Sequence, residues 1–442
     1  MRDLLVVGIV LICAVWALRR PWIGVMLWTW LSIMNPHRYT WGFAYDAPLA
    51  AIAAVATLLG LLFTKERQSP FQGAPVIWFA LLASWITLSW LMGIDVSGDY
   101  EQWDKVMKIY FMTFIALTLL FTKHHIMAFV WVSAGSLAIL AAKGGVFTVL
   151  TAGSHRVWGP AGSFIADNNH MALATIMAIP LLYFLLGQLT KRWMRLVMWG
   201  VILLSAAAAL GSHSRGGVLA IAAMVAMLWW RSERKGGVAV MILIGLLFLL
   251  PMMPEHWWER MTSIRSYEED ASAMGRINAW IVAWEVAKHN FFGGGMSYQH
   301  AVFFSLYGVY EAVARSAHSI YFQILGNHGF IGLFIYLALW IATYRTASWL
   351  RKNGKVHPET RWTADLGAMV QVSLVGFAVG GAFLSMPYFD LPYNMMVMVV
   401  LTKKWVEQKR WASEPDMSIL EYIGLRKRKS PPKPASSPAG PG

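Results

Sequence analysis

His318 is the residue of this chain that is best placed to do chemistry, because it ends a long polar segment and directly precedes an apolar run. That run extends from residue 319 to about residue 344, which is long enough to cross a bilayer. The unperturbed pKa of imidazole lies near neutrality, so a histidine at the mouth of a membrane helix is well placed to transfer a proton. A single histidine indicates little alone, and its interpretation depends on the residues that the fold places beside it.

Arg215 is the second residue of interest, because it lies in a loop of only a few residues between two apolar runs. An arginine at membrane depth is costly unless it is paired or functional. Gly216 and Gly217 follow it and allow a ligand or another backbone to approach closely. A guanidinium can bind phosphate oxygens through two parallel hydrogen bonds. The alternative is an interfacial arginine whose side chain reaches lipid headgroups.

Further basic residues occupy polar segments and are predicted to form, with Arg215, a pocket for an anionic ligand. Arg276 begins a helical pattern in the polar segment before His318, and Arg265 lies just upstream. Lys143 and Arg156 belong to a second polar segment. A surface position is the alternative interpretation, and it is strongest for Arg265.

The sequence Asp167-Asn168-Asn169-His170 opens another apolar run, and its first interpretation is a helix N-cap. Contact with a substrate is the alternative, with Asn168 as the candidate. A metal site of Asp167 and His170 lacks further ligands, and the acidic run at residues 268–270 is more typical of a solvated surface. We therefore predict neither a metal nor a cofactor.

The composition is that of an integral membrane protein. Of the 442 residues 57% are hydrophobic and 14% are charged, whereas soluble domains carry about 25% charged residues. The apolar runs are continuous and too long for barrel strands, so an all-α polytopic membrane protein with about 12 transmembrane helices is predicted. The runs lie near residues 3–18, 21–34, 47–64, 75–93, 106–121, 126–142, 171–187, 194–210, 216–230, 238–251, 319–344, 365–385 and 391–402.

Loop charges predict which ends of the helices face the cytoplasm, because basic loops remain on that side. The basic loops include residues 191–195, 231–235 and 345–361. The intervening segments, roughly 143–170, 211–216 and 252–318, then face outward. His318, Arg215 and Arg276 are thus expected on one extracytoplasmic face. The net charge of +14 lies largely in loops and in the tail, which favours contact with membrane lipids and argues against a nucleic-acid partner.

Four parts of the chain are expected. Residues 1–251 and 319–402 form the two parts of a transmembrane bundle, and residues 252–318 form one large helical loop between them. That loop is too small for an independent core, so it is predicted to pack on the bundle as a cap. Residues 403–442 form a basic cytoplasmic tail whose Pro-, Ser- and Gly-rich end is expected to be disordered. No nucleotide-binding or hydrolase motif occurs in a fitting context.

An ordered set of motifs resembles the O-antigen ligases of the wider ligase/polymerase family. His318-Ser319, followed after nine residues by Gly329 and then by Gly332, resembles their His-[Asn/Ser/Gln]-x9-Gly-x-x-[Gly/Thr/Tyr] signature. Three further landmarks of that family are resembled by Asp-Asn-x-His at 167–170, Ser-Arg-Gly-Gly at 214–217 and Gly-Arg-x-x-x-Trp at 275–280. The N-terminal residues 34–42 resemble a proteobacterial subgroup of O-glycosylation ligases, which leaves the acceptor open.

The resemblance implies a GT-C-like glycosyltransferase of the bacterial inner membrane, active on its periplasmic side in lipopolysaccharide biosynthesis. It would transfer glycan from an undecaprenyl-diphosphate carrier to lipid A–core oligosaccharide, inverting the anomeric centre without a metal. Arg215 and Arg276 would hold the diphosphate, and His318 would accept the proton of the acceptor hydroxyl. The residues expected to contact substrate around them are Arg265, Arg156, Lys143, Asn168 and Ser319.

Two alternatives share this chemistry: a Wzy-type polysaccharide polymerase and a ligase that glycosylates protein. A transporter of lipid-linked glycans is an alternative of a different class, since it also needs a basic cavity. A transporter typically carries broken or charged helices near the midplane in both halves, whereas a histidine at a helix mouth and a single large outward loop favour an enzyme.

Overall fold

The computed structural model describes residues 1–231, 235–249, 251, 253–262, 271–310 and 313–414. Over these residues the chain forms helices and no strand, so the all-α prediction is confirmed. The α-helices are α1 (Arg2–Arg19), α2 (Pro21–Met34), α3 (Leu49–Phe63), α4 (Ala74–Leu91), α5 (Tyr100–Leu119), α6 (Lys123–Leu150), α7 (Asn168–Gln188), α8 (Arg192–Gly211), α9 (Arg215–Arg231), α10 (Lys235–Leu249), α11 (Glu255–Thr262), α12 (Ala271–His289), α13 (Ala301–Tyr307), α14 (Ile320–Asn353), α15 (Arg361–Gly381), α16 (Asp390–Glu407) and α17 (Arg410–Ser413). Two short 3-10 turns are η1 (Pro36–Tyr39) and η4 (Pro358–Thr360).

Six of the described helices are long and apolar enough to cross a membrane. They are α4, α6, α7, α8, α14 and the helical segment that ends with α15. α2 and α3 are also apolar but shorter. A multi-pass helical membrane protein is therefore supported, while the number of about 12 crossings and the GT-C-like arrangement stay predictions.

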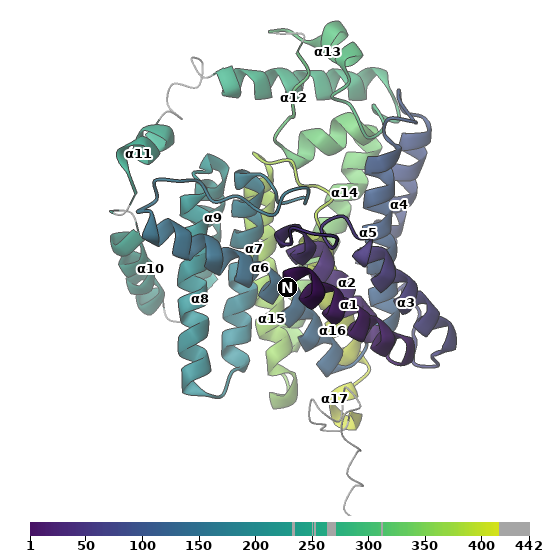
Figure 1. Ribbon diagram of the computed structural model, residues 1–442, viewed down its shortest axis with the longest axis vertical. Helices are drawn as coiled ribbons and strands as arrows, with labels where there is room; N and C mark the ends of the chain where they lie inside the picture. The colour runs from purple at the N-terminus through teal and green to yellow at the C-terminus, as the bar shows by residue number, and fades with distance from the viewer. Residues whose placement is uncertain (232–234, 250, 252, 263–270, 311–312, 415–442) are drawn as a thin grey trace, which may run out of the picture.

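The bundle is organised around α16, whose residues from 390 to 402 are all buried. This helix contacts α14, α6, α15 and α5. Figure 1 shows α6 to α10 on one side of this axis and α3 to α5 on the other. A helix that is apolar all round and surrounded by other helices is the expected form of a bundle core. α1, α2 and α3 add a smaller hydrophobic cluster of their own, which α2 joins to α5 and α6.

The helices between α10 and α14 lie across one end of the bundle (Figure 1). α12 packs on α14 and on α13, and these helices share a small hydrophobic cluster that includes Ala279, Val282 and Phe304. Trp280 stacks on Phe322 of α14 with ring centroids 5.0 Å apart. In the described part of residues 252–318, α12 therefore packs on the bundle through α14.

α14 breaks at Gly329, where φ is 68° and ψ is −174°, a conformation that suits glycine. A Cβ at this position would lie 2.5 Å from the carbonyl oxygen of Phe291. Residues 320–328 consequently form a separate first part of α14, which runs beneath α12 in Figure 1. The break also frees backbone carbonyls just before it, which need new donors.

Those carbonyls are satisfied by the segment that follows α12 and by α4. Gly294 N–H donates to the Gly326 carbonyl over 2.8 Å, and Gly295 N–H donates to the Asn327 carbonyl over 2.9 Å. Trp85 Nε1 donates to the His328 carbonyl over 2.8 Å. The glycine-rich turn at residues 293–295 is thus a pairing partner of the broken helix.

Replacing Gly329 by alanine is expected to destabilise the protein, because the backbone conformation is strained for any L-residue at a cost of about 1–3 kcal/mol and the Cβ meets the Phe291 carbonyl. Thermal unfolding in detergent would show a lower midpoint for Gly329→Ala. Gly187→Ala is the matched control, since nothing lies within 4 Å of its added Cβ and alanine stabilises a helix relative to glycine. Equal midpoints for the two variants would contradict the strained break.

Candidate active site

Three helices that are distant in sequence begin at the same end of the bundle. Asn168, the first residue of α7, donates from Nδ2 to the Ser212 carbonyl over 2.6 Å, which joins it to the turn before α9. Ser316, just before α14, hydrogen-bonds Ser385 between α15 and α16 over 2.8 Å. Phe383 of that connection lies against Gly216 of α9. The starts of α7, α9 and α14 therefore surround one region, named here the site end.

The start of α7 has the predicted N-cap. The Asp167 carboxylate accepts from the backbone N–H of Asn169 over 2.8 Å and from its side chain over 2.9 Å. Burial alone would raise the pKa of Asp167, but these hydrogen bonds and the neighbouring His170 hold it below its ordinary value. The site end thus contains one ionised carboxylate.

The start of α9 is a tight, buried turn. His213 has a left-handed φ of 57°, and its Nε2 lies 2.8 Å from the Gly153 carbonyl oxygen. Ser214 accepts from the N–H of Gly217 over 3.1 Å. Gly217 also lies against Ala172 of α7. Gly216 and Gly217 therefore let α9 pack closely on its neighbours, and this packing sets the position of Arg215 at the start of the helix.

His318 is held by its neighbour Ala317, which is buried and bonded on both sides. Ala317 N–H donates to Tyr298 Oη over 2.7 Å, and its carbonyl accepts from Trp280 Nε1 over 2.7 Å. His318 itself has a left-handed φ of 45°, which is uncommon for a residue with a Cβ. Within the described part of the chain no hydrogen-bond partner reaches its buried Nδ1.

The electrostatics of the site end keep His318 neutral. Burial, followed by the charges of Arg276 and His170, lowers the pKa of His318 to about 4, and Asp167 opposes this shift only in part. At neutral pH the imidazole is therefore unprotonated and can accept a proton. A base with this pKa is weaker than free imidazole, so its action depends on precise positioning.

Arg276 is brought to His318 by the helical repeat of α12. Trp280 follows it by four residues, so both side chains lie on one face of the helix. Because Trp280 bonds the carbonyl just before His318, that face is turned toward the site end. This geometry explains the Gly-Arg-x-x-x-Trp pattern, in which the tryptophan anchors the helix and the arginine faces the histidine.

The predicted substrate contacts have different outcomes. Ser319 is buried beside His318, and Asn168 bonds the turn that leads to Arg215. Lys143 instead lies over the ring of Tyr39, with 4.4 Å between Nζ and the centroid. Arg156 is exposed on the α6–α7 connection. Arg265 lies outside the described residues.

Sequence reasoning gave too little weight to His170. The Phe164 backbone acts on the His170 ring, and His170 in turn acts electrostatically on His318. The Asp-Asn-x-His pattern was a signal for this position, since it places Asp167 and His170 on the first turn of one helix. His328 is buried, and its Nε2 lies 2.7 Å from the Tyr388 hydroxyl. No group of three or more metal-binding side chains occurs among the described residues.

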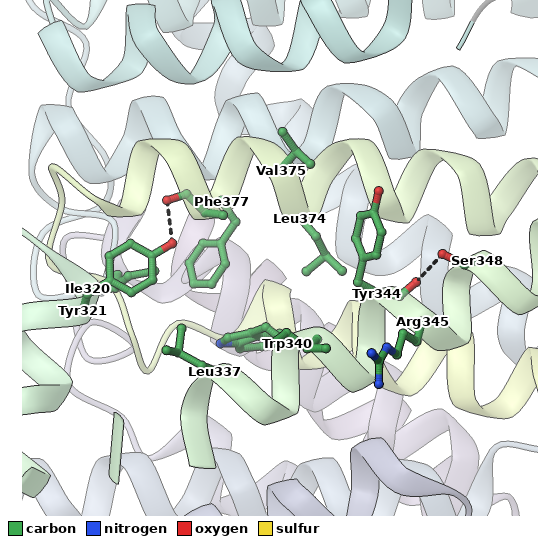
Figure 2. A pocket seen from close by; sticks show the side chains of 12 residues that line it. Ile320, Tyr321, Leu337, Trp340, Tyr344, Arg345, Ser348, Leu374, Val375 and Phe377 are labelled. Atoms are coloured by element: carbon green, nitrogen blue, oxygen red, sulfur yellow. Dashed lines mark hydrogen bonds between the residues drawn. The ribbon is translucent and has the colours of Figure 1, made fainter. Parts of the chain in front are cut away.

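An apolar groove of about 470 Å³ lies between α14 and α15, close to the site end. Figure 2 shows Ile320 and Tyr321 at one end of this groove and Arg345 and Ser348 at the other. Tyr321 donates to the Ala378 carbonyl over 2.8 Å and so connects the two helices. Because Ile320 follows Ser319 directly, the groove begins next to His318.

Comparisons with known proteins agree with the motifs. A family model described as O-antigen ligase matches residues 200–337, which include Arg215, Arg276, His318 and Gly329. A second family model, described as a family of unknown function, matches residues 1–190. No curated protein matches the chain. The resemblance of this chain to the O-antigen ligases is thereby confirmed over residues 200–337.

Proposed function

We propose that the protein transfers glycan from undecaprenyl diphosphate to lipid A–core oligosaccharide at the periplasmic face of the inner membrane. The observation that carries this proposal is a neutral, buried imidazole beside Arg276 at an end of the bundle where three helices begin. A ligase/polymerase type of function follows from the family. The donor, the acceptor and the residue roles below are proposals.

His318 acts as the general base in this mechanism. It takes the proton from an acceptor hydroxyl while that oxygen attacks the anomeric carbon of the donor glycan. The bond between the anomeric carbon and the diphosphate oxygen breaks, and its electron pair leaves with undecaprenyl diphosphate. A single displacement of this kind inverts the anomeric centre. The proton is released from His318 to water after transfer, which is easy for a group with a low pKa.

The diphosphate would be held by Arg215 and Arg276 as negative charge develops on it. The starts of α7, α9 and α14 add favourable partial charges, because a helix N-terminus is positive. The anion would in turn raise the proton affinity of His318 at the moment when it must accept a proton. Arg276 thus keeps the base unprotonated until the donor is bound.

The groove between α14 and α15 supports a lipid-linked donor. It begins at Ile320, immediately after Ser319, and its lining is almost entirely apolar. An isoprenoid chain leaving a diphosphate at the site end would find apolar surface there without crossing a polar layer. The groove and the arginines therefore suit the two chemically different parts of one donor molecule.

A polysaccharide polymerase and a protein glycosylation ligase use the same donor chemistry, so the acceptor must be tested directly. We expect that the purified protein in liposomes, given undecaprenyl-diphosphate-linked glycan, modifies lipid A–core and releases undecaprenyl diphosphate. Growth of free polymer would instead identify a polymerase, and glycosylated protein would identify the third activity. Donor movement across the bilayer without release of undecaprenyl diphosphate would identify a transporter.

His318→Gln is expected to abolish transfer while donor binding is retained, because glutamine keeps a polar side chain but accepts no proton. In the wild type, kcat/KM for the donor reports the free enzyme and should fall only as the pH drops toward about 4. Arg276→Gln should move that acid limb to higher pH, since the guanidinium no longer opposes protonation. An acid limb near the ordinary histidine pKa in the wild type would contradict the buried neutral base.

Arg215→Ala is expected to weaken donor binding by a factor on the order of ten to a hundred, as for loss of a charge-assisted hydrogen bond. Arg215→Lys should recover part of the affinity, because it keeps the charge without the fork geometry. Arg192→Ala is the matched control, since Arg192 is exposed and begins α8 at the opposite end of that helix from the site end. Donor affinity equal in all variants would remove Arg215 from the diphosphate site.

A further inference from the structure

Three cations of the N-terminal part each lie over an aromatic ring and form what is named here the N-terminal basic cluster: Arg38, Lys105 and Lys143. Arg38 Cζ lies 4.7 Å from the ring centroid of Tyr45. The distances from Nζ to the ring are 4.2 Å for Lys105 over Phe164 and 4.4 Å for Lys143 over Tyr39. All three side chains come from different elements, namely η1, α5 and α6.

Arg38 and Lys105 are brought together because η1 lies against the α6–α7 connection, and Lys143 reaches η1 through Tyr39. The guanidinium of Arg38 packs on Gly162, where an added Cβ would lie 3.6 Å from Cζ. Phe164, whose ring contacts Lys105, belongs to the same turn as Gly162. Arg38 and Lys105 are close enough to repel each other electrostatically. Like charges gathered in this way favour an anion.

The acidic groups near the N-terminal basic cluster neutralise only part of its positive charge. Asp46 pairs with Arg38 over 3.3 Å, but its side chain is 85% exposed, and such pairs are weak. Glu101 and Asp390 act on Lys105 from a distance, and Asp390 is buried beside Ser32. Among the described residues neither Lys105 nor Lys143 forms a salt bridge.

Phe164 connects the N-terminal basic cluster to the site end. The ring of Phe164 contacts Lys105, and the Phe164 backbone acts on His170, which in turn acts electrostatically on His318. A molecule that presents a hydroxyl to His318 could therefore place another group on the cluster after a few sugar rings. The donor diphosphate is accounted for by Arg215 and Arg276, so a second basic region suits the second substrate.

We propose that the N-terminal basic cluster is an acceptor subsite that binds phosphate or carboxylate groups of an anionic glycolipid. This inference rests on the proposed glycan transfer and specifies the class of its acceptor. It also assigns a role to residues 1–190, which match a family of unknown function and contain the whole cluster. The residues proposed for chemistry on the donor lie in the other matched segment.

The double variant Lys105→Gln/Lys143→Gln tests the subsite, and Arg38 is left in place because it packs on Gly162. The probes are lipid A–core and the same glycolipid after enzymatic removal of its phosphates. We expect the variant to bind phosphorylated lipid A–core on the order of tenfold to a hundredfold more weakly than the wild type does. The wild-type affinity for this probe should fall with added salt, whereas donor affinity and thermal stability should not change in the variant.

Lys65→Gln/Lys191→Gln is the matched control, since both lysines are exposed in loops distant from the site end. If Lys105→Gln/Lys143→Gln lost affinity equally for the two probes, or changed donor affinity, the proposed subsite would be wrong. The cluster would then serve only to hold η1 in place. Binding is measured separately from transfer. Charge-dependent binding of lipid A–core without its glycosylation would therefore sink the proposed function and still support an anionic subsite.

Discussion

The break of α14 at Gly329 leaves backbone carbonyls that must find donors outside their own helix, and the position of the site end follows from where those donors lie. Gly294 and Gly295 supply two of them from the segment after α12. Asp99 holds the same segment from the α4–α5 connection, accepting the N–H of Met296 over 2.7 Å. The first part of α14 is thereby fixed between α12 and the bundle, so His318 and Arg276 are positioned by the same set of bonds.

A second constraint acts on charge. In the proposed reaction the site end would bind an anion, and its base would have to be unprotonated before the anion arrives. Burial and Arg276 meet both requirements, because they lower the pKa of His318 and leave a positive charge for a ligand. A bound diphosphate would cancel part of that effect and strengthen the base. In the proposed reaction, substrate binding and base strength are thus coupled through Arg276 without a conformational change.

Sequence patterns predict the helices of this fold well, because long apolar runs have few alternatives in a membrane. Loop charges also predict correctly that Arg215, Arg276 and His318 approach one end. Lys143 lies over Tyr39, a neighbour that the sequence does not predict. Its partners, and the neighbours of Lys105, are set by how η1 packs on the α6–α7 connection. That contact joins segments more than a hundred residues apart, and no periodicity within either segment encodes it.

His318 combines two features that a structural residue would avoid. It has a left-handed backbone conformation, and its buried Nδ1 lacks a partner among the described residues. Leaving a buried polar atom unbonded costs about 1–3 kcal/mol, and a strained conformation costs a similar amount. Such costs persist only where the surrounding structure enforces them, as the two bonds to Ala317 do here. His328 has the opposite character, since it is fully bonded within the bundle. The contrast distinguishes a histidine at the site end, with one ring nitrogen unbonded among the described residues, from one whose ring is bonded on both sides in the core.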